Sequence, residues 1–233
     1  MEISKIVDLI ERFAPLDSQE KWDCSGFQIQ NGKTEVKKIL LCLSVTEDIV
    51  NQAVNKNCDM ILAHHPLFFV PFSFNKGVSI YSAHTNMDKA DGGTTDTLIE
   101  LLDLKYAQKT GEFLRFVELS DRMSLAELIN LFKDRLNLKT VRVVNNFNKQ
   151  AVNKIAFCSG SGMDFLPDAE AIGADVFVTA DVKYHQALES NVIIIDIGHF
   201  ESEHPILSTF KTILNETNVE VISADEKSPF INY

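Results

Sequence analysis

Three short stretches hold most of the side chains in this sequence that could bind metal ions or activate water. They are residues 64–66 (His-His-Pro), 84–88 (His-Thr-Asn-Met-Asp) and 199–203 (His-Phe-Glu-Ser-Glu), and they contain four of the six histidines. Imidazole nitrogens and carboxylate oxygens are ligands for borderline divalent metals. Two such ions lower the pKa of a shared water towards ~7, which makes hydroxide available at neutral pH. The sequence therefore predicts a metal site with hydrolytic chemistry.

Each stretch follows an apolar run that is typical of a buried strand. The runs are residues 60–63, 80–83 and 192–195. Open α/β sheets place their sites just beyond the carboxyl ends of the strands. We therefore expect the three stretches to meet at such ends.

The local spacing indicates how the side chains are presented. Pro66 stops regular strand pairing, so that His64 and His65 can both face one pocket at the turn. His199 and Glu203 are four residues apart, which places them on one face of a helix.

The same spacing separates His84 from Asp88, but here we expect a loop, because two glycines at 92–93 precede the next helix. His84 is then either a direct ligand or a residue that orients one.

The chain contains an internal repeat in which matching segments lie 115 or 116 residues apart. The pairs are 38–44 with 154–160, 58–63 with 174–179, His84 with His199, and Asp88 with Glu203. The two histidine–carboxylate pairs count as one match, and three matches in register predict a duplication. The alternative is that two βαβ units look alike because α/β folds demand it.

The repeat also singles out Asp181, which falls at the position of His65. We expect Asp181, perhaps with His185 four residues on, to line the site and to contact substrate or metal-bound water rather than the metal itself. The loop at 159–162 (Ser-Gly-Ser-Gly) is either a phosphate cradle or a plain turn.

Composition narrows the class of protein. The 233 residues are 45% hydrophobic, enough for a substantial core, and carry a net charge of −11. That charge disfavours a nucleic-acid surface and adhesion to anionic membranes. No apolar run approaches the ~20 residues of a membrane helix. The four cysteines form no C-x-x-C pair and are expected to be buried thiols in a reducing, cytoplasmic setting.

Periodicity and capping signals predict the remaining elements. Thr46 is expected to cap one helix, and Ser124 with Glu127 forms a capping box for another. The predicted helices also include 2–14 and 95–103, and the predicted strands are 38–44, 59–63, 78–83 and 113–119, before a second repeat from 152 to about 217.

Together the motifs resemble those of the GTP cyclohydrolase 1 type 2 homologue family, also called the NIF-three-like family. The matching elements are W-D-x-S-G at 22–26, D-x-I-x-x-H-H-P-L at 59–67, Y-S-A-H-T-N-x-D at 81–88, G-A-D-V-x-x-T-x-D at 173–181 and G-H-x-x-S-E at 198–203. Cys24 and Ser44 stand where the family commonly has Asn and Asp.

The resemblance implies a dinuclear metal site and a toroidal homohexamer. It also implies that the C-terminal segment returns to complete the N-terminal part of the fold. The implied metal ligands are His64, His65, Asp88, His199 and Glu203, with Glu203 bridging.

The predicted fold is therefore α/β, with two lobes from an internal duplication, mixed sheets flanked by helices and the dimetal site in the cleft between the lobes. The metal-binding lobe is expected to comprise 1–105 and 195–233, and the second lobe 106–194. The Phe-rich segment 68–72 is expected to be a subunit contact or a lid rather than a base-stacking platform.

The predicted function is that of a hydrolase that uses two divalent ions, with Zn, Mn, Fe and Ni all compatible with the ligands. By resemblance, metal-bound hydroxide would open the imidazole ring of a GTP-like nucleotide and release formate. The candidate catalytic residues are Glu203, His84 and Asp181. The alternatives are a dimetal phosphoesterase and a non-catalytic, metal-binding ring that acts as a scaffold or regulatory partner.

Overall fold

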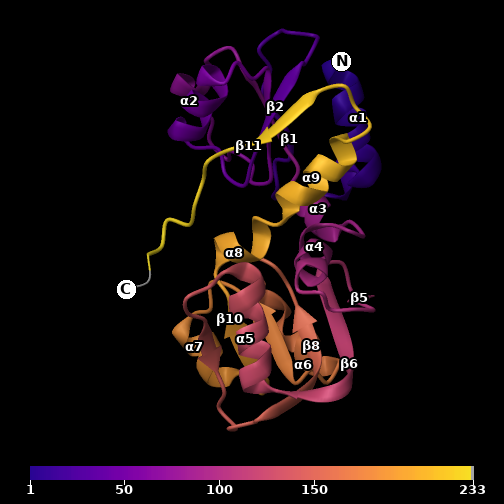
Figure 1. Ribbon diagram of the computed structural model, residues 1–233, viewed down its shortest axis with the longest axis vertical. Helices are drawn as coiled ribbons and strands as arrows, with labels where there is room; N and C mark the ends of the chain where they lie inside the picture. Colours follow the sequence, from indigo (N-terminus) through magenta and orange to yellow (C-terminus); the bar gives the residue numbers. More distant parts are fainter. Residues whose placement is uncertain (232–233) are drawn as a thin grey trace. The chain divides into compact units, whose positions relative to one another are not determined.

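The computed structural model describes residues 1–231, which divide into two compact units. The first unit comprises Met1–Gly93 and Ile206–Lys227, and the second comprises Thr94–Pro205 with the described residues from Ser228. Each unit is built on its own mixed sheet, with helices packed against it (Figure 1). The predicted α/β fold with two mixed, helix-flanked sheets is confirmed.

The first unit has a five-stranded sheet. Its order is β1 (Gly26–Ile29), β4 (Ser79–Ser82), β3 (Met60–Ala63), β2 (Lys38–Cys42) and β11 (Glu220–Ser223). Only β1 is antiparallel to its neighbour. Strands β3 and β4 are buried along their whole length, as expected of parallel strands covered on both faces.

Helices cover the first sheet. They are α1 (Ile3–Phe13), α2 (Glu47–Asn55), α3 (Thr85–Lys89) and α9 (Ile206–Leu214), with short 3₁₀ turns at Leu16–Ser18 and Phe72–Phe74. Helix α2 is capped by Thr46, whose Oγ1 accepts from the Ile49 amide, and it packs Ile49, Val50 and Ala53 into the core. Helix α9 lies beside α1 and contacts β2 and β11 (Figure 1).

The second unit has a six-stranded sheet. Its order is β5 (Gln108–Thr110), β6 (Leu114–Ser124), β8 (Ala151–Phe157), β9 (Val176–Thr179), β10 (Ile193–Asp196) and β7 (Arg142–Val144). The three strands β8, β9 and β10 are parallel, and the outer strands are antiparallel to their neighbours. Its helices are α4 (Thr94–Leu101), α5 (Leu125–Leu136), α6 (Leu166–Ala171), α7 (Tyr184–Glu189) and α8 (His199–Glu203), with a 3₁₀ turn at Met163–Phe165.

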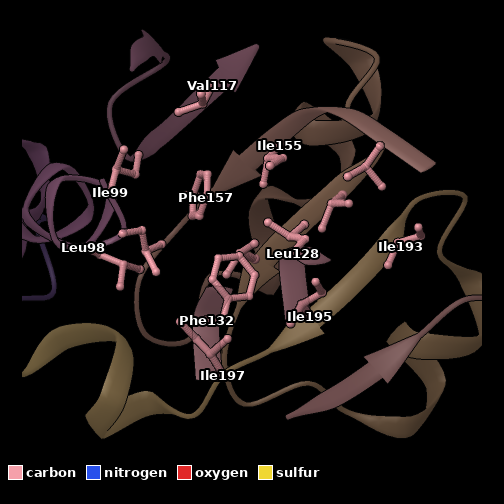
Figure 2. Close-up of a cluster of buried hydrophobic side chains, with 14 of the residues drawn as sticks. Leu98, Ile99, Val117, Leu128, Phe132, Ile155, Phe157, Ile193, Ile195 and Ile197 are labelled. Atoms are coloured by element: carbon pink, nitrogen blue, oxygen red, sulfur yellow. The ribbon is translucent and has the colours of Figure 1, made fainter. Parts of the chain in front are cut away.

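Successive side chains of a strand point to opposite faces, and each face of this sheet has its own helices. Phe157, Val178 and Ile195 pack against α4 and α5, including Leu128 and Phe132 of α5 (Figure 2). The intervening residues Ala156, Phe177 and Ile194 pack instead with Ala169 of α6. The predicted capping box starts α5, because Ser124 and Glu127 bond each other's amides.

The two sheets share a central pattern. Strands β2, β3 and β4 correspond to β8, β9 and β10, in the same order and with the same parallel pairing. The two sheets also share one side-chain contact, which Asp59 makes in the first unit and Asp175 makes in the second. The Asp59 carboxylate accepts from the amides of Lys37 and Lys38, and the Asp175 carboxylate accepts from those of Asn153 and Lys154, at the same spacing.

The boundaries of the units differ from those expected. Residues 94–105 and 195–205, expected in the metal-binding lobe, belong to the second unit. The reason is packing: α4 places Leu98 and Ile99 in the second core, and Ile195 lies inside β10. The segment 206–227 does return to the first unit, where β11 pairs with β2.

None of the helices formed by residues 1–231 has the length and apolar character needed to cross a bilayer.

Candidate metal centre

Three imidazoles gather at the strand ends of the first unit. His64 and His65 directly follow β3, and His84 directly precedes α3. Their ring centroids are 5.0 to 5.6 Å apart, and one ligand-type nitrogen from each lies within 4.8 Å of the others. The strand ends thus bring together three of the histidines that the sequence singled out.

Each of these rings is oriented through its Nδ1 atom. His64 Nδ1 lies 2.9 Å from the Ala83 carbonyl oxygen, and His65 Nδ1 lies 2.7 Å from Ser44 Oγ. His84 Nδ1 lies 3.1 Å from Asp23 Oδ1. An acceptor on Nδ1 fixes the tautomer that presents Nε2 to a metal.

Asp88 joins this group from a helix, not from the expected loop. Residues Thr85–Lys89 form α3, and the Asp88 amide donates to the His84 carbonyl. Tertiary hydrogen bonds hold this short helix: Thr85 bonds Asp23, and Asn86 bonds the Ala14 carbonyl. Local glycine signals could not reveal these contacts. Asp88 Oδ1 lies 3.5 Å from His64 Nε2.

Asp23 organises this corner, although the sequence suggested no role for it beyond its motif. Its side chain is fully buried and accepts hydrogen bonds from His84, from the Cys24 amide, from Ser25 Oγ and from Thr85. Burial raises its pKa, but the bonds from His84 and Thr85 outweigh burial and hold the pKa well below its ordinary value. Asp23 therefore remains a carboxylate that fixes the His84 ring.

The second unit holds one imidazole between two carboxylates. On α8, His199 Nε2 lies 2.8 Å from Glu203 Oε2, as the i, i+4 spacing predicted. His199 Nδ1 lies 2.7 Å from Asp181 Oδ2. The bond to Glu203 contributes most, and with Asp181 it raises the pKa of His199 to about 9 despite partial burial. Asp181 therefore contacts His199, and its expected contact with substrate or metal-bound water stays a prediction.

The side chain of Glu203 is buried and lies directly against the backbone of Gly160. A Cβ added to Gly160 would lie 2.0 Å from Glu203 Oε1. The Gly160 amide donates to Ser202 Oγ, which ties the loop to α8. The amides of Ser159 and Gly162 donate to Thr95 and Thr179. The loop 159–162 is thus a strand-to-helix turn that positions Glu203. Three of its amides donate hydrogen bonds to side chains of the protein itself.

Comparison with known proteins places the chain in a family. Residues 1–229 match the family described as Duf34/NIF3 (NGG1p interacting factor 3). The chain belongs to the Duf34/NIF3 family.

Relatives of similar size agree with this assignment, and a solved structure has the same fold. Two relatives are each named "GTP cyclohydrolase 1 type 2 homolog", one from Clostridium perfringens and one from Campylobacter jejuni. Each is 34% identical to this chain, and each match covers 99% of this chain and 99% of the relative. The fold matches that of Staphylococcus aureus hypothetical protein SA1388, with a TM-score of 0.89 at 24% identity over 100% of this chain and 99% of that one.

Two further histidines lie apart from these groups in this NIF3-family chain. His185 is exposed on α7, where its ring meets Tyr184 edge-on, with centroids 5.5 Å apart. His204 follows α8 and stacks on Phe200 at 4.6 Å.

The residues of each unit fit a divalent metal. Nδ1 of His64, His84 and His199 faces a carbonyl or carboxylate oxygen, and Nδ1 of His65 faces the Ser44 hydroxyl. The carboxylates of Asp88 and Glu203 lie within 3.5 Å of an Nε2 atom. This is the pattern of metal-binding histidines, in which the outer bond orients the ring and makes the ligand nitrogen more basic.

Proposed function

We propose that this NIF3-family protein is a metal-dependent hydrolase of a nucleotide-like small molecule. One observation supports this most directly: all four histidines of the candidate site are held at Nδ1 by an oxygen atom. Four rings oriented in the same way indicate preparation for ligand binding, because buried structural histidines have no need to present the same nitrogen.

The proposed ligands for two divalent ions are His64, His65, Asp88, His199 and Glu203, with Glu203 in the bridging role that the family resemblance implies. When bound, the ions would supply Lewis acidity and water activated near neutral pH.

The chain's own groups would position ligands and substrate. Asp181 would hold His199, and the Ala83 carbonyl would hold His64. His84 has its Nδ1 proton held by Asp23, so Nε2 is the atom at which it would exchange a proton with substrate. In this scheme Asp181 is a positioning residue, and His84 is either a further ligand or the acid–base group.

The names of the relatives suggest the substrate. They point to GTP, with hydrolytic opening of the purine imidazole ring and release of formate as the proposed reaction. We further propose that the active form is a homohexamer, with the exposed Phe69 and Phe72 of the Phe-rich segment at a subunit contact. Light scattering that finds a monomer at micromolar concentration would contradict this assembly.

The decisive experiment is metal analysis of the purified protein, followed by a nucleotide hydrolysis screen with the matched metal. Formate release from GTP would support the proposal, and phosphate release would indicate a phosphoesterase. Glu203→Gln should abolish turnover, whereas Glu201→Gln, the same change on the same helix, should retain it. A fully metal-loaded protein that hydrolyses no nucleotide would instead be the metal-binding scaffold.

A further inference from the structure

An exposed indole lies beside the histidine group of the first unit. Trp22 is 61% exposed, and its ring meets the His84 ring edge-on with centroids 6.0 Å apart. Phe68, two residues after Pro66, lies within 28° of parallel to the indole at 6.3 Å and is 68% exposed. Trp22 thus borders the His84 ring, Phe68 lies beside Trp22, and most of the surface of both aromatic rings faces solvent.

The backbone that carries this indole is anchored by its neighbour in the chain. The Asp23 amide donates to the Glu20 carbonyl at 2.9 Å, and the buried Asp23 carboxylate binds His84 and Thr85. The same residue therefore anchors both the backbone next to Trp22 and the ring of His84. A backbone that is already ordered lowers the cost of ordering the site when a ligand binds, which favours affinity.

We propose that Trp22, together with Phe68, forms a stacking platform for a planar heteroaromatic ring, and that this ring belongs to the substrate of the histidine site. The inference rests on the proposed function and specifies its substrate class as a purine-like base. Indole faces stack on any flat base, whereas a phosphate or sugar offers them no comparable surface. The closeness of the indole to His84 would bring a stacked ring to the imidazoles.

A subunit contact is the competing use of these aromatic residues. Phe69 and Phe72 belong to the same segment and are 81% and 92% exposed. They provide matched controls, because a subunit contact would involve the whole segment, whereas a stacking platform depends on Trp22 and Phe68.

Trp22 is the only tryptophan of the chain, so the intrinsic fluorescence reports on this side chain alone. Guanosine titrated into the metal-free protein should quench the emission in a saturable way, whereas ribose 5-phosphate and inorganic phosphate should not. In equilibrium dialysis, Trp22→Leu should bind guanosine on the order of ten-fold more weakly. Phe69→Leu should bind it as the wild type does.

The platform would be excluded if guanosine caused no saturable quenching, or if Trp22→Leu bound guanosine with wild-type affinity. A change of assembly mass in Trp22→Leu and Phe69→Leu alike, with guanosine binding intact, would assign the aromatic residues to a subunit contact. Because quenching is measured on the wild type, it does not depend on how a variant folds. Quenching without hydrolysis of any nucleotide would refute the proposed function but not the platform. Hydrolysis without quenching would refute the platform but not the proposed function.

Discussion

The two units share one scaffold but present different chemistry at equivalent strand ends. After β3, the turn carries His64 and His65, whereas the equivalent turn after β9 carries Ala180 and Asp181. The first unit thus presents three imidazoles and one carboxylate, and the second presents one imidazole between two carboxylates.

The difference shows that the central strands and the ligand-type residues follow separate rules. The parallel strands and the Asp59 and Asp175 contacts are the same in both units because both sheets need them. The turn residues lie beyond the last residue of each strand, where the side chains differ although the amides of His64 and Ala180 still donate to a neighbouring carbonyl. One unit can therefore be rich in nitrogen ligands and the other in oxygen ligands.

The largest effect is expected from removing nitrogen ligands of the first unit. His64→Ala with His65→Ala should reduce the metal content of the purified protein to background, because two ligand nitrogens are lost. Elemental analysis with circular dichroism checks both metal and fold. His185→Ala, which changes an exposed histidine of the second unit, should retain the metal. A full complement of metal in the double variant would show that the ligand assignment is wrong.

The next largest effect concerns Glu203 in the second unit. Gly160→Ala should lower the free energy of unfolding by about 3 kcal/mol, through left-handed strain and the collision with Glu203. Gly173→Ala is the matched control, because Gly173 also has a positive φ but has no atom within 4 Å of an added Cβ. It should cost about 1 kcal/mol. If denaturant unfolding gave both variants the same loss in free energy of unfolding, Gly160 would not be the residue that positions Glu203.

A third prediction contrasts the two orienting carboxylates. Asp181→Asn should weaken metal affinity by roughly 10- to 100-fold with little change in Tm, because Asp181 is half-exposed and bonds His199. Asp23→Asn should also lower Tm, since Asp23 is buried and accepts several hydrogen bonds. Metal titration and thermal unfolding of both variants measure this. The contrast fails if the two variants have the same Tm.

The smallest effect concerns acid stability. Burial raises the pKa of Asp59, but hydrogen bonds from the Lys37 amide and Lys33 hold it below the ordinary value. A lowered pKa in the folded state stabilises the fold above the unfolded-state pKa of about 4, and this contribution is lost as pH falls through the folded-state pKa. Asp59→Asn should therefore lose less stability than the wild type between pH 5 and about 2 in urea titrations. Wild-type and Asp59→Asn curves of unfolding free energy against pH that run parallel would contradict this prediction.

The sequence was most informative where strands and caps are local. The buried runs at β3 and β4 and the caps at Thr46 and Ser124 could be predicted because each depends on neighbouring residues. The short outer strands β1, β5, β7 and β11 were not predicted, since three or four half-exposed residues become a strand only through their partner.

The site was predictable in residue type but not in its supporting contacts. The proximity of His64, His65 and His84 followed from strand ends. The role of Asp23 did not, because its partners lie about sixty residues away in the sequence. Asp181 was found through the repeat, but its contact with His199 depends on a left-handed backbone at Asp181, with φ of 55°, that no local signal announced.

The division of the first unit into two sequence segments affects the order in which it can form during synthesis. A ribosome releases residues 1–93 first, when β2 still lacks β11 as its outer neighbour and α1 lacks α9. Residues 94–205, which form the body of the second unit, must emerge before Ile206–Lys227 becomes available. Until then the apolar edge of β2 is open to pairing with other chains, a known route to aggregation. The second unit, mostly continuous in sequence, has no such delay for its sheet, so the first unit is the part of the nascent chain whose sheet edge is unpaired for longer.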